Sequence, residues 1–340
     1  RRVGTRPVLF DSYQIDIERW PLLTPFRIAR GAKTEAIVVT VSLARDGIVG
    51  RGEGCPYPRY GETPETAAAA LEAALHAVRA AATPAAARAI LAADCPPGSA
   101  RNALDCALWD FEAKASGSTV SACAGLPPPR PLLTCYTLSL ASPKEMADTA
   151  VEHRECPLLK LKLGDPPLDA ERMRAVRAAR PEARLVADAN EGWRTCDLED
   201  LLAVAAEVGI EVVEQPLPAT ADAALKNLAS PVPICADEAA APGANITRLA
   251  DRYQAINLKL DKTSGLTGAL SAIRHARSAG CRVMIGSMVT TSLSMAPAAL
   301  IGAEADWVDL DSPLLLARDR PHAMTITAGL LSPPSPELWG

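Results

Sequence analysis

The sequence predicts an α/β fold, a (β/α)8-type (TIM-like) barrel preceded by an N-terminal α+β capping domain. Short apolar segments alternate with amphipathic segments throughout the last two thirds of the chain, as in parallel βα units. The first third instead mixes alternating strand patterns with alanine-rich stretches, and the proline-rich connector LPPPRP (126–131) separates the two parts. We therefore assign residues 1–125 to the capping domain and 126–321 to the barrel, and expect residues 322–340 to pack back on the cap.

The capping domain is predicted from a strand pattern and two helical regions. AIVVTVSLA (36–44) alternates in the manner of an antiparallel strand. The alanine-rich run 64–93 predicts one or two helices with a break near Thr83 and Pro84. A further helix is expected over 100–116, where spacings of four, three and four form one apolar stripe: Leu104, Leu108, Phe111 and Ala115.

The barrel is predicted from eight candidate strands. These cover 132–140, 158–163, 183–190, 210–216, 232–238, 254–260, 281–287 and 306–312. Amphipathic stretches such as 169–181 and 266–280 lie between them, which indicates parallel strands joined by right-handed crossovers. Eight units favour a closed barrel over a doubly wound sheet, and no Gly-x-Gly-x-x-Gly follows a strand to indicate a dinucleotide fold.

Charge and composition exclude several classes of protein. The net charge of -5 provides no basic field for nucleic acid. No run reaches the roughly 18 apolar residues that cross a bilayer, and the start RRVGTRPVLFDSYQ lacks a secretory apolar core, so we expect a cytoplasmic protein without a membrane partner. The nine scattered cysteines contain no CxxC pair and are expected to be free thiols, and a homo-oligomer remains compatible with the sequence.

Charged residues share one face of the predicted barrel strands. Alternate residues of a barrel strand point inward, and active sites lie at the C-terminal strand ends. Lys162, Asp188, Glu214, Asp237 and Lys259 follow one another at intervals of 22 to 26 residues, about one βα unit each. The residues of the opposite parity are apolar, so we expect the charged set to face inward at equivalent heights.

Three carboxylates on consecutive strands predict a metal site. Asp188, Glu214 and Asp237 would supply the hard oxygen ligands that suit one Mg2+ ion, with Asn190 supporting them. Each acid could instead cap a following helix, but that reading does not explain their common period.

Three lysines flank this predicted site. A lysine near other cations has a lowered pKa and can act as a base. Lys162 and Lys259, on opposite sides of the barrel, could remove and return an α-proton while the metal stabilises the enediolate. Lys160 would lower the pKa of its neighbour and hold the substrate carboxylate, whereas Lys262 reads as a loop or supporting residue. Plain salt bridges to the acids are the alternative.

The motifs KLKLG, VADAN, VVEQP, CADE and INLKLDKTSGLT together resemble those of the enolase superfamily, within its muconate-lactonizing subgroup. The resemblance covers almost the whole chain. It implies metal ligands Asp188, Glu214 and Asp237, catalytic Lys162 and Lys259, and Glu238 as a hydrogen-bond partner of Lys259. One departure is KTSG, where the family's familiar run is KTGG.

The stretch DWVDLDS narrows the expected reaction. Asp309 and Asp311 share a parity at the end of the eighth strand, where two carboxylates would bind a cationic group. This D-x-D resembles the element with which dipeptide epimerases hold the substrate ammonium. FRIARG and CPYPRYGE resemble the substrate-covering loops of L-Ala-D/L-Glu epimerases, which act in murein peptide metabolism. For the far carboxylate of such a dipeptide we choose Arg30, with Arg27 and Arg59 as alternatives.

The resemblance thus implies a Mg2+-dependent epimerase acting on a small dipeptide. Two rivals remain open. One is another reaction of the subgroup, N-acylamino acid racemisation or o-succinylbenzoate synthesis, whose substrates carry no ammonium for Asp309 and Asp311. The other is a barrel that binds a ligand without catalysis.

Overall fold

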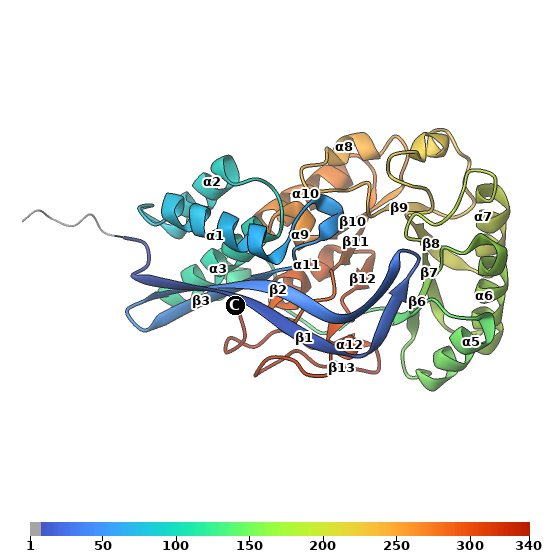
Figure 1. Cartoon of the computed structure of the whole chain (residues 1–340), viewed down its shortest axis with the longest axis horizontal. Helices are drawn as coiled ribbons and strands as arrows, with labels where there is room; N and C mark the ends of the chain where they lie inside the picture. The colour runs from blue at the N-terminus through green and yellow to red at the C-terminus, as the bar shows by residue number, and fades with distance from the viewer. Residues whose placement is uncertain (1–7) are drawn as a thin grey trace, which may run out of the picture.

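The computed structural model describes residues 8–340, so residues 1–7 of the expected capping domain lie outside the described part. Figure 1 shows a cap with a long two-stranded ribbon that reaches across to the barrel. The cap contains β1 (Ser12–Ile28), β2 (Gly31–Arg45), β3 (Ile48–Gly54), the 3-10 turn η1 (Pro58–Tyr60), α1 (Pro64–Val78), α2 (Pro84–Asp94), α3 (Ser99–Ser116) and α4 (Val120–Cys123). As predicted, the alanine-rich run forms two helices, and the Thr83 side chain caps the second by accepting from Ala86 N at 3.1 Å.

Helix α3 packs unusually close to the cap's antiparallel sheet. Its buried residues include Leu104, Leu108 and Phe111, while Ala115, expected on the same stripe, is exposed. The close approach is possible because β3 presents Gly50, Gly52 and Gly54 to the helix. A Cβ on Gly50 would lie 2.6 Å from Ala107 O, and one on Gly52 would overlap the carbonyl oxygen of Ala103. Alternate glycines therefore set the distance between helix and sheet.

The second part of the chain forms the predicted eight-stranded parallel barrel. Its strands are β5 (Tyr136–Leu138), β6 (Leu158–Lys162), β7 (Arg184–Asp188), β8 (Ile210–Glu214), β9 (Ile234–Ala236), β10 (Ala255–Lys259), β11 (Arg282–Gly286) and β12 (Trp307–Asp309), paired in that order. A hydrogen bond from Cys135 N to Val308 O, at 2.9 Å, joins the first strand to the last and closes the barrel.

Helices and turns surround the barrel. They are α5 (Pro143–Glu152), α6 (Pro166–Ala179), α7 (Leu198–Glu207), η2 (Asp222–Leu225), α8 (Ile246–Leu249), α9 (Leu260–Thr263), α10 (Leu266–Ser278), α11 (Ser292–Ile301), η3 (Gly302–Glu304) and α12 (Ser312–Leu315). None of the described helices combines the length and the apolar character that crossing a bilayer requires.

The strand parity predicted from the sequence is confirmed. The apolar set of one parity, for example Leu159, Val213 and Leu258, packs in the main core with the helices. The opposite parity forms a separate interior cluster with one residue at or beside each strand: Cys135, Leu158, Val186, Val212, Cys235, Ala255, Met284 and Trp307. This cluster fills the barrel interior below the charged residues, so the charged side chains lie directly above a packed apolar layer.

Two expectations about the strands were wrong in detail. The predicted first strand 132–140 is broken: β4 (Leu132–Leu133) leaves the barrel and pairs with β14 (Leu330–Leu331), which pairs with β13 (Ile326–Thr327). The charged residues are also not all at one height. Lys162, Asp188 and Glu214 are successive pairing partners, but Glu214 pairs with Cys235, two residues before Asp237. The stagger of strands in a barrel produces this offset.

The end of the chain lies against the cap and the barrel. Trp339 Nε1 donates to Cys106 O at 3.1 Å, and Gly340 N donates to Asp110 Oδ1 at 2.8 Å, both in helix α3. Both Trp339 and Leu338 are buried. The last residues thus contact the helix that also packs on β3.

Replacing Gly52 with alanine tests the close packing of β3 on α3. The added Cβ meets helix backbone, which cannot rotate away, so we expect a loss of about 1–3 kcal/mol in unfolding free energy. Urea unfolding followed by circular dichroism measures it. Arg51→Ala is the matched control, because the exposed Arg51 side chain points away from the helix and should change stability by less than about 0.5 kcal/mol. Equal stability of both variants would contradict the packing argument.

Candidate active site

A cavity of about 230 Å³ lies between the cap and the C-terminal ends of the barrel strands. Cap and barrel both line it, with Phe26, Tyr57 and Tyr60 from the cap and Lys162, Lys259 and Asp311 from the barrel. This is the position at which barrel enzymes place their substrates. The predicted site residues Asn190, Asp237, Glu238, Asp309 and Arg30 line the same cavity.

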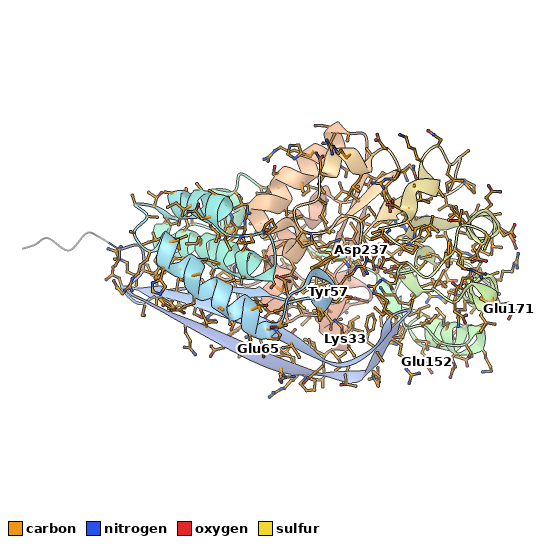
Figure 2. The ribbon with its side chains drawn as sticks, turned by 45° about the horizontal axis from the view of Figure 1, so that its top comes forward. Lys33, Tyr57, Glu65, Glu152, Glu171 and Asp237 are labelled. Atoms are coloured by element: carbon orange, nitrogen blue, oxygen red, sulfur yellow. The ribbon has the colours of Figure 1, made fainter. Side chains whose placement is uncertain are left out.

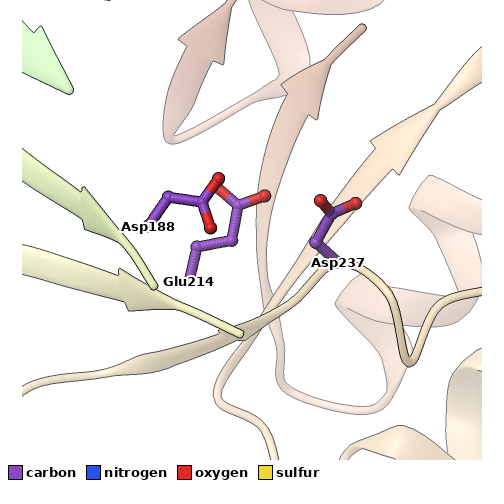
Figure 3. Close-up of side chains that lie close together, drawn as sticks. All are labelled: Asp188, Glu214 and Asp237. Carbon is purple, nitrogen blue, oxygen red and sulfur yellow. The ribbon is translucent and has the colours of Figure 1, made fainter. Parts of the chain in front are cut away.

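The three predicted metal ligands converge beneath this cavity. Asp188, Glu214 and Asp237 each offer one oxygen atom, and these atoms all lie within 4.8 Å of one another (Figure 3). All three are buried. Burial first, and then the charge of Asp188, raise the pKa of Glu214, because packed carboxylates disfavour each other's ionisation.

Several features of the cluster fit a bound cation. Three carboxylate oxygens form a hard donor set of the kind Mg2+ prefers. Two buried oxygen atoms beside it, Asn190 Oδ1 and Glu238 Oε2, accept no hydrogen bond from the described residues. Buried polar atoms normally find a partner, and a cation with bound water would supply one here.

Neighbouring polar groups hold the carboxylates in place. Asn257 Nδ2 donates to Glu214 Oε1 at 2.7 Å, and Asn190 N donates to Asp188 Oδ1 at 2.9 Å. Lys262 Nζ lies 2.6 Å from both Asp237 Oδ1 and Asp237 O. The sequence analysis assigned Lys262 to a loop or supporting role. In the structure it is buried against the cluster and donates hydrogen bonds to both the backbone and the side chain of Asp237.

The lysines bracket the carboxylates. Lys162 Nζ lies 2.6 Å from Asp188 Oδ2, and Lys259 Nζ lies 2.9 Å from Asp237 Oδ2. Their strands, β6 and β10, are four places apart in the eight-stranded order, so the two ammonium groups face the cavity from opposite sides. Such a pair can reach both faces of a carbon atom held between them.

Lys160 lies deeper, beneath the cavity. Its Nζ is 2.6 Å from Asp309 Oδ2, 2.6 Å from Glu214 Oε2 and 3.3 Å from Asp188 Oδ2, and its side chain is 1% exposed. Three carboxylates thus surround one ammonium group. The sequence analysis expected Lys160 to lower the pKa of Lys162 and to hold the substrate carboxylate. In the structure it contacts the acids and does not line the substrate cavity.

For Lys160 and Lys259 the structure gives the opposite of a lowered lysine pKa. Burial alone would lower the pKa of Lys160 and of Lys259, but nearby carboxylates outweigh burial and hold both well above the usual value. For Lys259 the dominant carboxylate is that of Asp237. Lys160 Nζ lies 2.6 Å from Glu214 Oε2 and Lys259 Nζ lies 2.9 Å from Asp237 Oδ2, so a cation that neutralised these acids would make proton release from either ammonium group easier.

Asp309 and Asp311 both reach the cavity wall, but with different partners. Asp309 pairs with Lys160, whereas Asp311 Oδ2 accepts a hydrogen bond from Thr137 N at 2.7 Å. Asp311 stands before α12 yet makes no side-chain cap bond to that helix. Burial, and then the charge of Asp309, raise the pKa of Asp311 to about 6. A cationic ligand would relieve this repulsion.

Two loop assignments differ from the prediction. Glu238, expected to bond Lys259, accepts instead from Arg30 Nη1 at 2.6 Å and from Asn190 Nδ2 at 3.3 Å. Arg30 also donates to Asn190 O at 3.0 Å. The tip of the β1–β2 ribbon lies over Glu238, so Arg30 pairs with this buried carboxylate, although its side chain still lines the cavity.

The sequence analysis missed Lys33, which also lines the cavity. Its Nζ lies 4.8 Å from the centre of the Tyr57 ring, and both residues are labelled in Figure 2. Among the described residues no carboxylate forms an ion pair with it. Arg59, another candidate, pairs with Glu191 at 2.5 Å. Side chains alternate along the strand that follows the Ala29–Arg30 turn, and this alternation places residue 33 on the cavity side. It is the feature of the sequence that could have identified Lys33.

Comparison with known proteins shows the family to which the chain is related. Residues 13–125 match the family described as mandelate racemase / muconate lactonizing enzyme, N-terminal domain, and residues 144–335 match the enolase C-terminal domain-like family. An L-Ala-D/L-Glu epimerase of Escherichia coli strain K12 is 42% identical over 92% of this chain and 97% of its own. An N-acetyl-D-glutamate racemase of Pseudoalteromonas is 39% identical over 89% and 95%.

A solved structure is equally similar. An enolase family member from Agrobacterium tumefaciens, described as homologous to dipeptide epimerases and bound to sodium and L-Ala-L-Glu, superposes with a TM-score of 0.91 at 47% identity, covering 96% of this chain and 99% of its own. These relatives are isomerases or their homologues, acting on amino acid derivatives. The chain therefore belongs to the mandelate racemase and muconate lactonizing enzyme family of the enolase superfamily.

Proposed function

We propose that this protein is a Mg2+-dependent dipeptide epimerase that inverts the α-carbon of the C-terminal residue of L-Ala-D/L-Glu. The observation that carries the proposal is the pair Lys162 and Lys259, which face one cavity from opposite sides of three converging carboxylates. One lysine on each face of a carbon atom is the arrangement that proton removal and return with inversion requires.

The proposed roles follow from position. Asp188, Glu214 and Asp237 would hold one Mg2+ ion, which stabilises the negative charge that develops on the substrate carboxylate. Neutral Lys162 or Lys259 accepts the α-proton on one face. The ammonium group of the other lysine then donates a proton to the opposite face. Lys160 keeps the acids in place through its contacts with Glu214 and Asp188.

The dipeptide part of the proposal rests on the far end of the cavity. Asp309 and Asp311 would receive the substrate ammonium, which would offset the burial of Asp311 and its repulsion by Asp309, the two causes that raise its pKa. Lys33, at the cap side, would receive the side-chain carboxylate of glutamate, in place of Arg30.

The free cysteines of the described chain, most of them buried, accord with a reducing, cytoplasmic setting.

A second candidate is racemisation of an N-acylated glutamate. The 39% identical N-acetyl-D-glutamate racemase favours it, and its substrate also carries a carboxylate side chain. Such a substrate has no ammonium group for Asp309 and Asp311, which would then be buried acids without a cationic ligand.

Exchange of the α-proton with solvent tests the proposed reaction. In deuterium oxide with Mg2+, L-Ala-L-Glu should gain deuterium at the glutamate α-carbon and yield the other epimer, because each lysine exchanges its protons with solvent. Proton NMR of the α-hydrogen signal follows both events, and a chelator should abolish them. N-acetyl-glutamate is the competing substrate: faster exchange with it than with the dipeptide would favour the second candidate, and no exchange with either would overturn both.

Truncation of one lysine should separate the two faces. Lys162→Ala should lower epimerisation by roughly 10²–10⁴-fold, the usual contribution of a general acid or base. It should abolish deuterium exchange from one epimer and leave exchange from the other, which depends on Lys259. Lys144→Ala, which removes an exposed lysine paired with Asp148, is the control and should leave both rates unchanged. Unimpaired epimerisation by Lys162→Ala would remove it from the mechanism.

Substitution of Lys33 tests the side-chain carboxylate site. Lys33→Met keeps the length of the stem but removes the charge, so kcat/KM for Ala-Glu should fall by roughly 10- to 100-fold relative to kcat/KM for Ala-Leu, the worth of a charged hydrogen bond. Arg30→Met is the matched comparison. It frees Glu238 and should affect both dipeptides alike. A selective loss of Ala-Glu activity in Arg30→Met, with Lys33→Met unaffected, would return the role to Arg30.

A further inference from the structure

Asp237 differs from the other two carboxylates in how its backbone is held. Asp188 and Glu214 are the last residues of their strands and lie within the pairing ladder. Strand β9 ends at Ala236, whose partner is Ile256, and its pairing with β8 ends earlier, at Cys235. Asp237 therefore lies beyond the ladder, and strand pairing does not fix its backbone.

The side chain of Gln215 takes the place of the missing ladder bond. Gln215 N donates to Cys235 O at 2.9 Å, and in a parallel pair the next bond would run from Asp237 N to Gln215 O. Gln215 has a positive φ of 36°, and its carbonyl accepts instead from Glu191 N at 2.8 Å. Its side-chain Oε1 accepts from Asp237 N and from Ala239 N, each at 3.0 Å.

Two buried residues complete the hydrogen bonding of this amide. Gln215 Nε2 donates to Leu217 O at 2.8 Å and to the Tyr253 hydroxyl at 2.9 Å. The hydroxyl in turn donates to Asp222 Oδ2 at 2.6 Å. An ionised carboxylate can only accept, so the Tyr253 hydroxyl donates its hydrogen bond to Asp222 and accepts one from Gln215. This polarity directs Nε2 toward Tyr253 and leaves Oε1 for the N–H groups of Asp237 and Ala239.

We propose that Asp222, Tyr253 and Gln215 form a positioning relay that fixes Asp237 for cation binding. Asp222 and Tyr253 do not line the substrate cavity, so they act only through Gln215. Lys262 anchors Asp237 from the other side, through the carbonyl oxygen and Oδ1. The relay rests on the proposed cation site, and loss of its hydrogen bonds would leave Asp237 able to shift away from Asp188 and Glu214.

Direct titration with Mn2+, followed by electron paramagnetic resonance of the full chain, tests the relay without measuring turnover. Gln215→Leu removes the acceptor for Asp237 N and should raise the Kd for Mn2+ by roughly 10- to 100-fold, as loss of a partner that orients a metal ligand commonly does. Tyr253→Phe should raise the Kd by a smaller factor. The double variant should bind no more weakly than Gln215→Leu alone, because both changes act through the same amide.

Asp110→Asn is the matched control. It alters a fully buried, hydrogen-bonded aspartate in α3, away from the cluster, and should leave the Kd unchanged. Normal Mn2+ binding by Gln215→Leu and Tyr253→Phe would overturn the relay alone, as would an equal loss in Asp110→Asn. Failure of the unaltered chain to bind Mn2+ would overturn the cation site together with the relay. If Gln215→Leu does not fold, the Kd of Tyr253→Phe against that of Asp110→Asn decides the same question.

Discussion

The structure depends on the burial of opposed charges inside the barrel. Five acidic side chains lie there beside four lysines, all almost inaccessible to solvent: Asp188, Glu214, Asp237, Asp309 and Asp311 with Lys160, Lys162, Lys259 and Lys262. Charges in such surroundings are costly unless each is paired, and removing one partner leaves the other uncompensated. Lys160 has the most ion pairs of the four lysines, because three of the carboxylates surround it. With all nine groups ionised, a bound divalent cation would change the balance from one excess carboxylate to one excess positive charge, which would suit a substrate carboxylate.

The same charges indicate why the proposed lysine bases would depend on a bound cation. In the structure the acids favour the ammonium forms of Lys160 and Lys259. A lysine must be neutral to act as a base. Neither lysine would therefore accept a proton while the carboxylates stabilise its ammonium form. Coordination of a cation would withdraw the negative charge from Lys259 through Asp237, because the same carboxylate serves both partners. Metal binding and activation of the proposed base would thereby be coupled through one side chain.

The sequence was sufficient for the barrel and for the charged residues on its strands, because side-chain parity and the βα period are local properties. Lys162, Asp188 and Glu214 follow directly from them. The offset of Asp237 could not be read, since barrel stagger is a property of the closed sheet. The partners of Arg30 and Glu238 were missed for a related reason. They meet across 208 residues of chain, where the ribbon tip crosses the barrel mouth, and only the folded structure determines which cation reaches which acid.

The cap also holds the segment that directly follows Lys259, one of the two proposed bases. Asp261, two residues after Lys259, accepts from Cys55 N at 2.9 Å and from Asn102 Nδ2 at 2.8 Å, both in the cap.

Ser264, the residue where this chain departs from the familiar KTGG run, adopts a left-handed conformation with φ of 65°. Its hydroxyl accepts from Gly98 N in the cap at 3.1 Å, a contact that glycine could not make. Serine at this position therefore adopts a conformation that favours glycine and adds a bond between the domains. Because helix α3 follows Gly98 and packs directly on β3, these contacts connect the sheet and helix of the cap to the segment that follows Lys259. The cap would therefore position this proposed base as well as line the cavity.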